Sequence, residues 1–134
     1  MKISHIEHVG IAVSDLEAAI DFCEKNLGLP CYGIEEVPDQ KVRTAFFQVG
    51  QTKIESLECT SPEGPVGKFI SKKGEGLHHI AFATSEIAEQ FDEVAKKGVQ
   101  LIDSKPRKGA EGLDIAFLHP RSTCGVPIEL CETK

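Results

Sequence analysis

The chain has 134 residues, of which 21 are acidic and 15 basic, so that its formal net charge is −6, and 40% of its residues are hydrophobic. This length and composition are those of an ordinary globular domain that can fold without disulfide bonds. The charged residues form no basic stripe, which argues against nucleic acid as a partner. No signal peptide opens the sequence and no apolar run could span a membrane, so we also expect no membrane partner.

The cysteines predict a reducing environment. There are five of them, an odd number, without CxxC spacing and without a cluster of the zinc-finger type. We therefore expect reduced thiols that pack as small hydrophobic side chains, and a cytoplasmic location.

The first half of the chain begins with a short strand around His8. A helix over 15–27 follows, because its apolar residues recur at helical spacing and Gly28 stands at its end. We expect Ser14 to cap this helix, with Glu17 completing a capping box. Strands are then predicted over 31–37, 44–49 and 53–59, with Gly50 and Gln51 as the turn between the last two.

The second half repeats this order after a linker that carries a short helix over 66–72. A strand around His79 leads into a helix over 86–97, which ends at Gly98, and then into strands over 99–103, 114–118 and 126–131. His8 aligns with His79, and Ile54-Glu55 aligns with Ile128-Glu129. The sequence therefore predicts an α+β fold of two tandem βαβββ modules, residues 1–59 and 77–134, joined by the linker 60–76 into a single domain.

Strand alternation places each histidine on the same face as two very small residues. His8 shares its face with Gly10 and Ala12, and His79 shares its face with Ala81 and Ala83. Such small residues leave room for a ligand, whereas a face built for a dense core would be filled.

A pseudo-twofold axis between the modules would bring His8, Glu55, His79 and Glu129 together. Two buried carboxylates without a cation repel each other, and one would have to take a proton. A divalent ion removes this conflict, and the mixed nitrogen and oxygen donors suit cobalt, nickel, zinc, manganese or iron(II) better than calcium. Four protein ligands leave positions of an octahedral ion open, as a Lewis-acid catalyst requires.

Longer motifs give this pattern a family resemblance that covers nearly the whole chain. They are the segments around His8 (8–13), around His79 (74–82) and before Glu129 (116–130). Together they resemble the vicinal oxygen chelate superfamily, which includes glyoxalase I, extradiol dioxygenases and antibiotic-resistance proteins, and within it the methylmalonyl-CoA epimerase family.

The resemblance implies a curved mixed sheet around a metal cleft, and an isomerase that interconverts (R)- and (S)-methylmalonyl-CoA. A base would remove the proton on C2, an acid would return one on the other face, and the metal would stabilise the enolate. The implied metal ligands are His8, Glu55, His79 and Glu129, and the implied acid and base are Glu55 and Glu129. The implied cofactor is a divalent metal, Co²⁺ foremost, with Zn²⁺, Mn²⁺ and Ni²⁺ as alternatives. The implied partners are a CoA thioester substrate and a second copy of the chain in a homodimer.

The sequence departs from the family at two positions. Some members have glutamine where this chain has Glu55, and a glutamate, proposed as a base, where this chain has Thr44. Because Thr44 cannot act as a base, we expect Glu55 to combine ligation with proton transfer, opposite Glu129.

Other activities of the same fold remain as alternatives. A glyoxalase I-type enzyme would use similar ligands but would need a surface for glutathione. A dioxygenase would use iron(II) with two histidines and one carboxylate, so that Glu55 would have no role. A drug-binding resistance protein would carry no stoichiometric metal, so metal content separates it from the enzymes.

Overall fold

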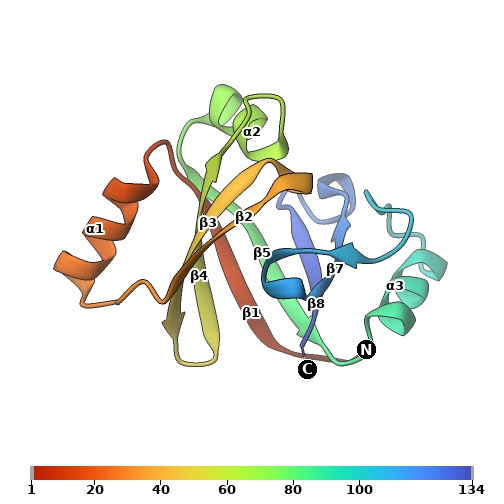
Figure 1. Cartoon of the computed structure of the whole chain (residues 1–134). Helices are drawn as coiled ribbons and strands as arrows, with labels where there is room; N and C mark the ends of the chain where they lie inside the picture. The colour runs from red at the N-terminus through yellow and green to blue at the C-terminus, as the bar shows by residue number, and fades with distance from the viewer. Residues whose placement is uncertain (1, 134) are drawn as a thin grey trace. The chain divides into compact units, whose positions relative to one another are not determined.

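The computed structural model describes residues 2–133. Their elements follow the predicted order (Figure 1): β1 (Ile3–Ala12), α1 (Leu16–Leu27), β2 (Gly33–Val37), β3 (Val42–Val49) and β4 (Thr52–Cys59), then α2 (Pro65–Lys73), then β5 (Gly76–Thr84), α3 (Ile87–Lys96), β6 (Arg107–Lys108), β7 (Asp114–Leu118) and β8 (Ile128–Glu132). The α+β class and the two βαβββ modules are thereby confirmed. No helix in the described part of the chain is long and apolar enough to cross a membrane.

The chain forms two compact units. Among the described residues, one unit contains residues 9–78, and the other contains residues 2–8 together with residues 79–133. Strands β1 and β5 each contribute residues to both units. The grouping of both modules into one domain around a metal cleft stays a prediction.

In the unit of residues 9–78 the strand order is β2-β3-β4-β1, with antiparallel pairing of β2 with β3 and of β3 with β4. Gly50, at φ 62°, makes the predicted turn between β3 and β4. Helix α1 buries Leu16 against Ala45 and Phe47, on one face of the sheet. Strand alternation directs the neighbouring side chains Phe46 and Glu55, which pair across β3 and β4, to the opposite face.

The start of α1 differs from the prediction. Asp15, not Ser14, is the N-cap, and its side chain accepts a hydrogen bond from the backbone N–H of Ala18. The predicted capping box is therefore wrong, because Glu17 lies in the first turn and pairs with Arg43 instead of reaching back to the cap. The end of the helix is as predicted, at Gly28 with φ 67°.

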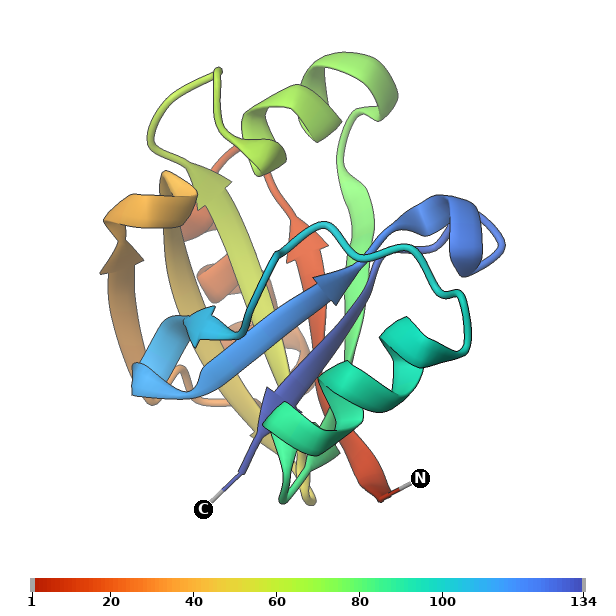
Figure 2. The ribbon, with the colours of Figure 1, turned by 90° about the vertical axis from the view of Figure 1, so that its right-hand side faces the viewer.

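In the other unit the strand order is β1-β5-β8-β7-β6, and Figure 2 shows α3 covering one face of β7 and β8. Strand β5 runs parallel to β8, whereas β8, β7 and β6 are antiparallel in turn, which gives a mixed sheet. The core lies between this face and α3, because the apolar residues of α3 recur at helical spacing along one side. Its members are Ile87, Phe91, Val94, Ala116, Leu118 and Leu130.

The strand predicted over 99–103 is wrong. Only Leu101 makes an isolated bridge, to Leu118, and the strand that precedes β7 is the two-residue β6 at Arg107–Lys108. Asp103 explains why the ladder stops. Its carboxylate accepts a hydrogen bond from the backbone N–H of Phe117, so a side chain occupies a position that a strand backbone would otherwise take.

Candidate metal centre

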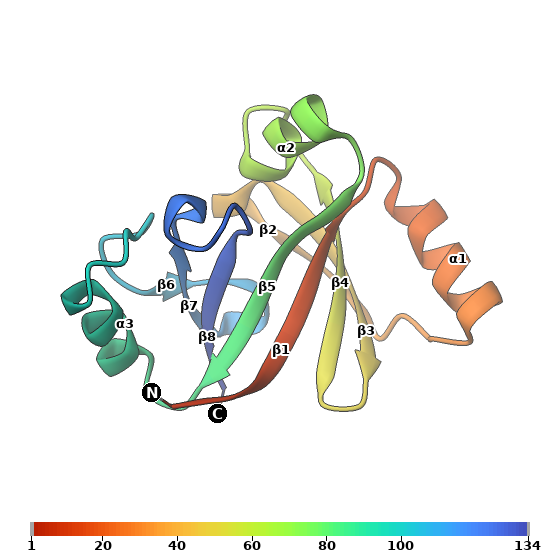
Figure 3. The same cartoon turned by 180° about the vertical axis from the view of Figure 1, so that it is seen from behind.

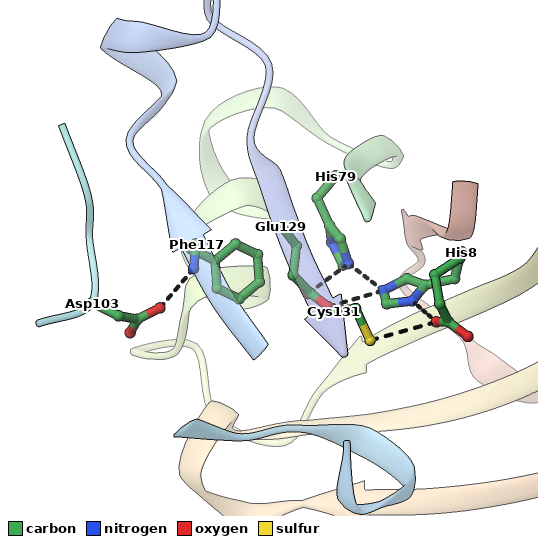
Figure 4. Close-up of polar contacts among 7 residues, drawn as sticks. His8, His79, Asp103, Phe117, Glu129 and Cys131 are labelled. Atoms are coloured by element: carbon green, nitrogen blue, oxygen red, sulfur yellow. Dashed lines mark hydrogen bonds and ion pairs between the residues drawn. The ribbon is translucent and has the colours of Figure 1, made fainter. Parts of the chain in front are cut away.

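Three donor groups meet in the unit that contains β5 and β8. The Nε2 atoms of His8 and His79 lie 3.0 Å apart. The carboxylate of Glu129 lies 3.6 Å from His8 Nε2 and 3.4 Å from His79 Nε2 (Figure 4). All three side chains are buried, with at most 5% of each residue exposed. The structure thus brings together three of the four residues that the sequence singled out.

The strand register explains this convergence. Strand β1 lies beside β5 (Figure 3), and each contributes one histidine. In the parallel pair of β5 and β8, Ala81 stands opposite Glu129, so Glu129 shares the face of His79, which lies two residues before Ala81. The His79 ring also meets the edge of Phe117, with ring centroids 5.6 Å apart. The positions of the three donor side chains are therefore set by three adjacent strands and by the neighbouring Phe117 ring.

The spacing of the donors fits a divalent metal ion. Ligand atoms about 2.1 Å from one ion lie about 3.0 Å apart at a right angle and about 3.4 Å apart at the tetrahedral angle. The three separations between His8, His79 and Glu129, of 3.0, 3.4 and 3.6 Å, fall at or just above these values. The set of two imidazoles and one carboxylate also matches the chemistry of cobalt, zinc, manganese, nickel or iron(II).

Glu7 is a further member of this cluster that the sequence did not predict. Its Oε1 atom lies 2.6 Å from Nδ1 of His8, and both residues are buried. The thiol of Cys131 contacts the same oxygen at 3.9 Å. Strand alternation assigns adjacent residues to opposite faces, so a contact between the side chains of Glu7 and His8 was not predicted. The sequence feature that could have indicated this contact is an acidic residue directly before a histidine in a strand.

The open space expected beside the small residues is not present around Ala81. Ala81 has no exposed surface and packs with Ile115 and Cys131, and the partly buried Leu113 and Phe117 adjoin the same cluster. The expectation was wrong for this part of β5, because residues of β7 and β8 fill the volume that the small side chain leaves.

Glu55 belongs to the other unit. It lies on β4 opposite Phe46 and is 4% exposed. Lys53, two residues earlier on the same strand face, is also buried, and its Nζ lies 6.0 Å from the centre of the Phe46 ring. Thr44 is buried as well and stands opposite Leu57. The role of Glu55 as a fourth ligand stays a prediction.

Three other acidic residues in the unit of residues 9–78 lie close together and have structural roles. Asp15, Glu17 and Glu58 bring their carboxylates close together. Asp15 caps α1, and Glu58 accepts a hydrogen bond from the backbone N–H of Leu16. Arg43 pairs with both Glu17 and Glu58. These contacts account for the group without a metal.

Known proteins are similar to this chain in sequence and in fold. Residues 7–117 match the model of the Glyoxalase/Bleomycin resistance protein/Dioxygenase superfamily. An ethylmalonyl-CoA/methylmalonyl-CoA epimerase of Cereibacter sphaeroides is 34% identical over 130 residues, which cover 96% of this chain and 97% of the relative. The chain belongs to the methylmalonyl-CoA epimerase family of this superfamily. The family predicted from the sequence is therefore confirmed.

Further comparisons give a solved structure of an epimerase and an uncharacterised relative. A variant of Streptomyces coelicolor methylmalonyl-CoA epimerase, solved in complex with 2-nitronate-propionyl-CoA, has a TM-score of 0.95 and 35% identity, and the match covers 98% of this chain and 95% of that one. The uncharacterised protein YqjC of Bacillus subtilis is 47% identical over 132 residues, covering 98% of this chain and 94% of the relative. The epimerase family thus shares the fold of this chain over nearly its full length.

Proposed function

We propose that this protein interconverts the (R) and (S) forms of methylmalonyl-CoA in a metal-dependent reaction. The observation that supports the proposal most strongly is the buried group of His8, His79 and Glu129, whose donor atoms have the mutual spacing of ligands to one ion. The names of the epimerase relatives supply the substrate class.

The reaction requires a base and an acid on opposite faces of C2. The C2–H bond lies between a thioester and a carboxylate, and its heterolysis leaves an electron pair that spreads onto the thioester oxygen. Returning a proton to the opposite face inverts the centre, while returning it to the same face restores the starting isomer. A divalent ion, when bound, would supply Lewis-acid stabilisation of the negative charge on that oxygen.

His8, His79 and Glu129 would hold this ion. Both imidazoles present Nε2 to the site, and their burial at 5% exposure keeps competing water away. We propose Glu55 as the fourth ligand, because it is the residue that the internal repeat pairs with Glu129 and because it is buried on its strand.

We assign the proton transfers to Glu55 and Glu129. Both are carboxylates on internal strands, β4 and β8, so their backbones are held on both sides by neighbouring strands. A positioned carboxylate that acts as a general base contributes about 10²- to 10⁴-fold to a rate. For one isomer, one glutamate would remove the C2 proton and the other would deliver a proton to the opposite face. In the reverse direction the two glutamates would exchange these roles.

The test of this proposal is the stereochemical conversion itself. Purified protein, loaded in turn with Co²⁺, Zn²⁺, Mn²⁺ and Ni²⁺, is mixed with (S)-methylmalonyl-CoA, and the isomers are separated by chromatography. We expect both isomers to appear in equal amounts at equilibrium, with the highest rate for Co²⁺. Conversion of a glutathione hemithioacetal in place of methylmalonyl-CoA would instead support the glyoxalase I-type alternative.

Two finer expectations accompany the proposed function. We expect a homodimer, because the open edges of small sheets are usually covered, and a molar mass close to 14.6 kDa at micromolar concentration would contradict it. We also expect a cytoplasmic enzyme, because the cysteines form no disulfide in the described residues.

A further inference from the structure

We propose that Glu7 is a positioning residue that prepares His8 to bind the metal ion. The proposal rests on the proposed role of His8 as a ligand. The Glu7 carboxylate contacts Nδ1 of His8, whereas Nε2 of the same ring faces His79 and Glu129. It acts on the far nitrogen of the His8 ring.

The contact between Glu7 and His8 is short and shielded from water. The distance from Glu7 Oε1 to His8 Nδ1 is 2.6 Å, and the two side chains are 8% and 6% exposed. A hydrogen bond that involves a charged group is stronger than a neutral one, and burial strengthens it further.

This contact determines which nitrogen of His8 can bind a metal. An ionised carboxylate only accepts hydrogen bonds, so the His8 ring must donate its Nδ1–H to Glu7. In the neutral ring the hydrogen is then absent from Nε2, which keeps a lone pair. Nε2 is the atom that faces His79 and Glu129. A carboxylate that holds the far nitrogen in this way also fixes the ring orientation and increases its basicity as a ligand.

Cys131 also contacts the Glu7 carboxylate. Its thiol, 1% exposed on β8, lies 3.9 Å from the same Oε1 atom. Glu129 lies two residues before Cys131 on the same strand face. Strand β8 therefore contributes one residue that faces both histidines and another that contacts the carboxylate behind His8.

The affinity of the full chain for Zn²⁺ tests the proposal directly. It is measured by competition with a chromophoric chelator for the unaltered protein and for Glu7→Gln, which keeps the size of the side chain. We expect a 10- to 100-fold weaker affinity for Glu7→Gln, the usual effect of removing such a partner. Equal affinities, or a parent protein that binds no Zn²⁺, would overturn the proposal.

Glu132→Gln is the matched control. Glu132 belongs to the same unit, and its carboxylate accepts a hydrogen bond from the backbone N–H of Ile87 without contacting His8. We expect Zn²⁺ affinity to be unchanged in this variant. An equal loss in both variants would mean that the affinity follows the general integrity of the unit, and would count against a specific role of Glu7.

Nitrogen NMR of the His8 ring gives a second test that needs neither metal nor substrate. We expect the metal-free parent to carry the hydrogen on Nδ1 of His8, and Glu7→Gln to shift a measurable fraction of it to Nε2. A parent protein with the hydrogen mainly on Nε2 would overturn the proposal even if Glu7→Gln failed to fold. Because neither readout uses methylmalonyl-CoA, failure of this proposal can be told apart from failure of the proposed epimerase activity.

Discussion

The Nε2 atoms of His8 and His79 lie 3.0 Å apart although the residues are 71 positions apart in the sequence. If His8 donates its Nδ1–H to Glu7, as we propose, His79 would donate its Nε2–H to His8 when no metal is bound. A metal ion would replace this hydrogen bond, since both Nε2 atoms would then need their lone pairs. Metal binding should therefore move or remove the Nε2 hydrogen of His79, while the hydrogen of His8 stays on Nδ1.

His79→Ala is expected to abolish tight metal binding, because it removes one of the donors that surround the centre. Isothermal titration with Co²⁺ or Zn²⁺ measures the affinity. His119→Ala serves as the control, since His119 lies in the same unit and its ring accepts a hydrogen bond from the backbone N–H of Arg121. Full affinity in His79→Ala would remove His79 from the ligand set.

Glu55→Gln should separate metal binding from proton transfer. The amide oxygen can still coordinate an ion, so we expect much of the metal affinity to remain. An amide cannot act as a base at neutral pH, so we expect epimerisation to fall by about two orders of magnitude or more. Quenched assays of isomer conversion measure the epimerisation rate, and metal analysis of the purified variant measures metal binding. Near-normal turnover would show that Glu55 is at most a ligand.

Glu129→Gln should produce the complementary defect. If Glu129 serves one face of C2 and Glu55 the other, the variant loses inversion but still exchanges the proton of one stereoisomer with solvent. A pure ligand defect would slow both isomers alike. Exchange measured separately from (R)- and (S)-methylmalonyl-CoA distinguishes the two cases, and equal slowing of both would argue against the division of roles.

The cysteines should differ in their reactivity toward alkylating agents. Cys124 is exposed, whereas Cys131 is 1% exposed. Burial, and to a smaller degree the neighbouring Cys31, raises the pKa of the Cys23 thiol. Fewer thiolates are then present at neutral pH, so Cys23 should react more slowly than Cys124. Mass spectrometry after timed exposure to iodoacetamide gives the order, and faster labelling of Cys23 would contradict it.

Much of the fold could be predicted from the sequence, because the internal repeat and the hydrophobic periodicity fix the order of the elements. His8 and His79 came from the same repeat, and so did Glu129, through the alignment of Ile54-Glu55 with Ile128-Glu129. The strand predicted over 99–103 failed because the side chain of Asp103, and not a backbone carbonyl, accepts the hydrogen bond of the Phe117 backbone N–H. Glu7 was missed because alternation alone gives no account of how a long side chain reaches its neighbour.

Solvent deuterium incorporation at C2 of methylmalonyl-CoA tests the proposed metal-dependent epimerisation directly. Metal-loaded protein is incubated with one stereoisomer in D₂O, and the thioester is followed by mass spectrometry and by proton NMR. We expect one deuteron to enter C2 and both stereoisomers to form, with no exchange when the protein is stripped of metal. Metal-loaded protein that leaves the C2 proton in place over many hours would contradict the proposed epimerisation.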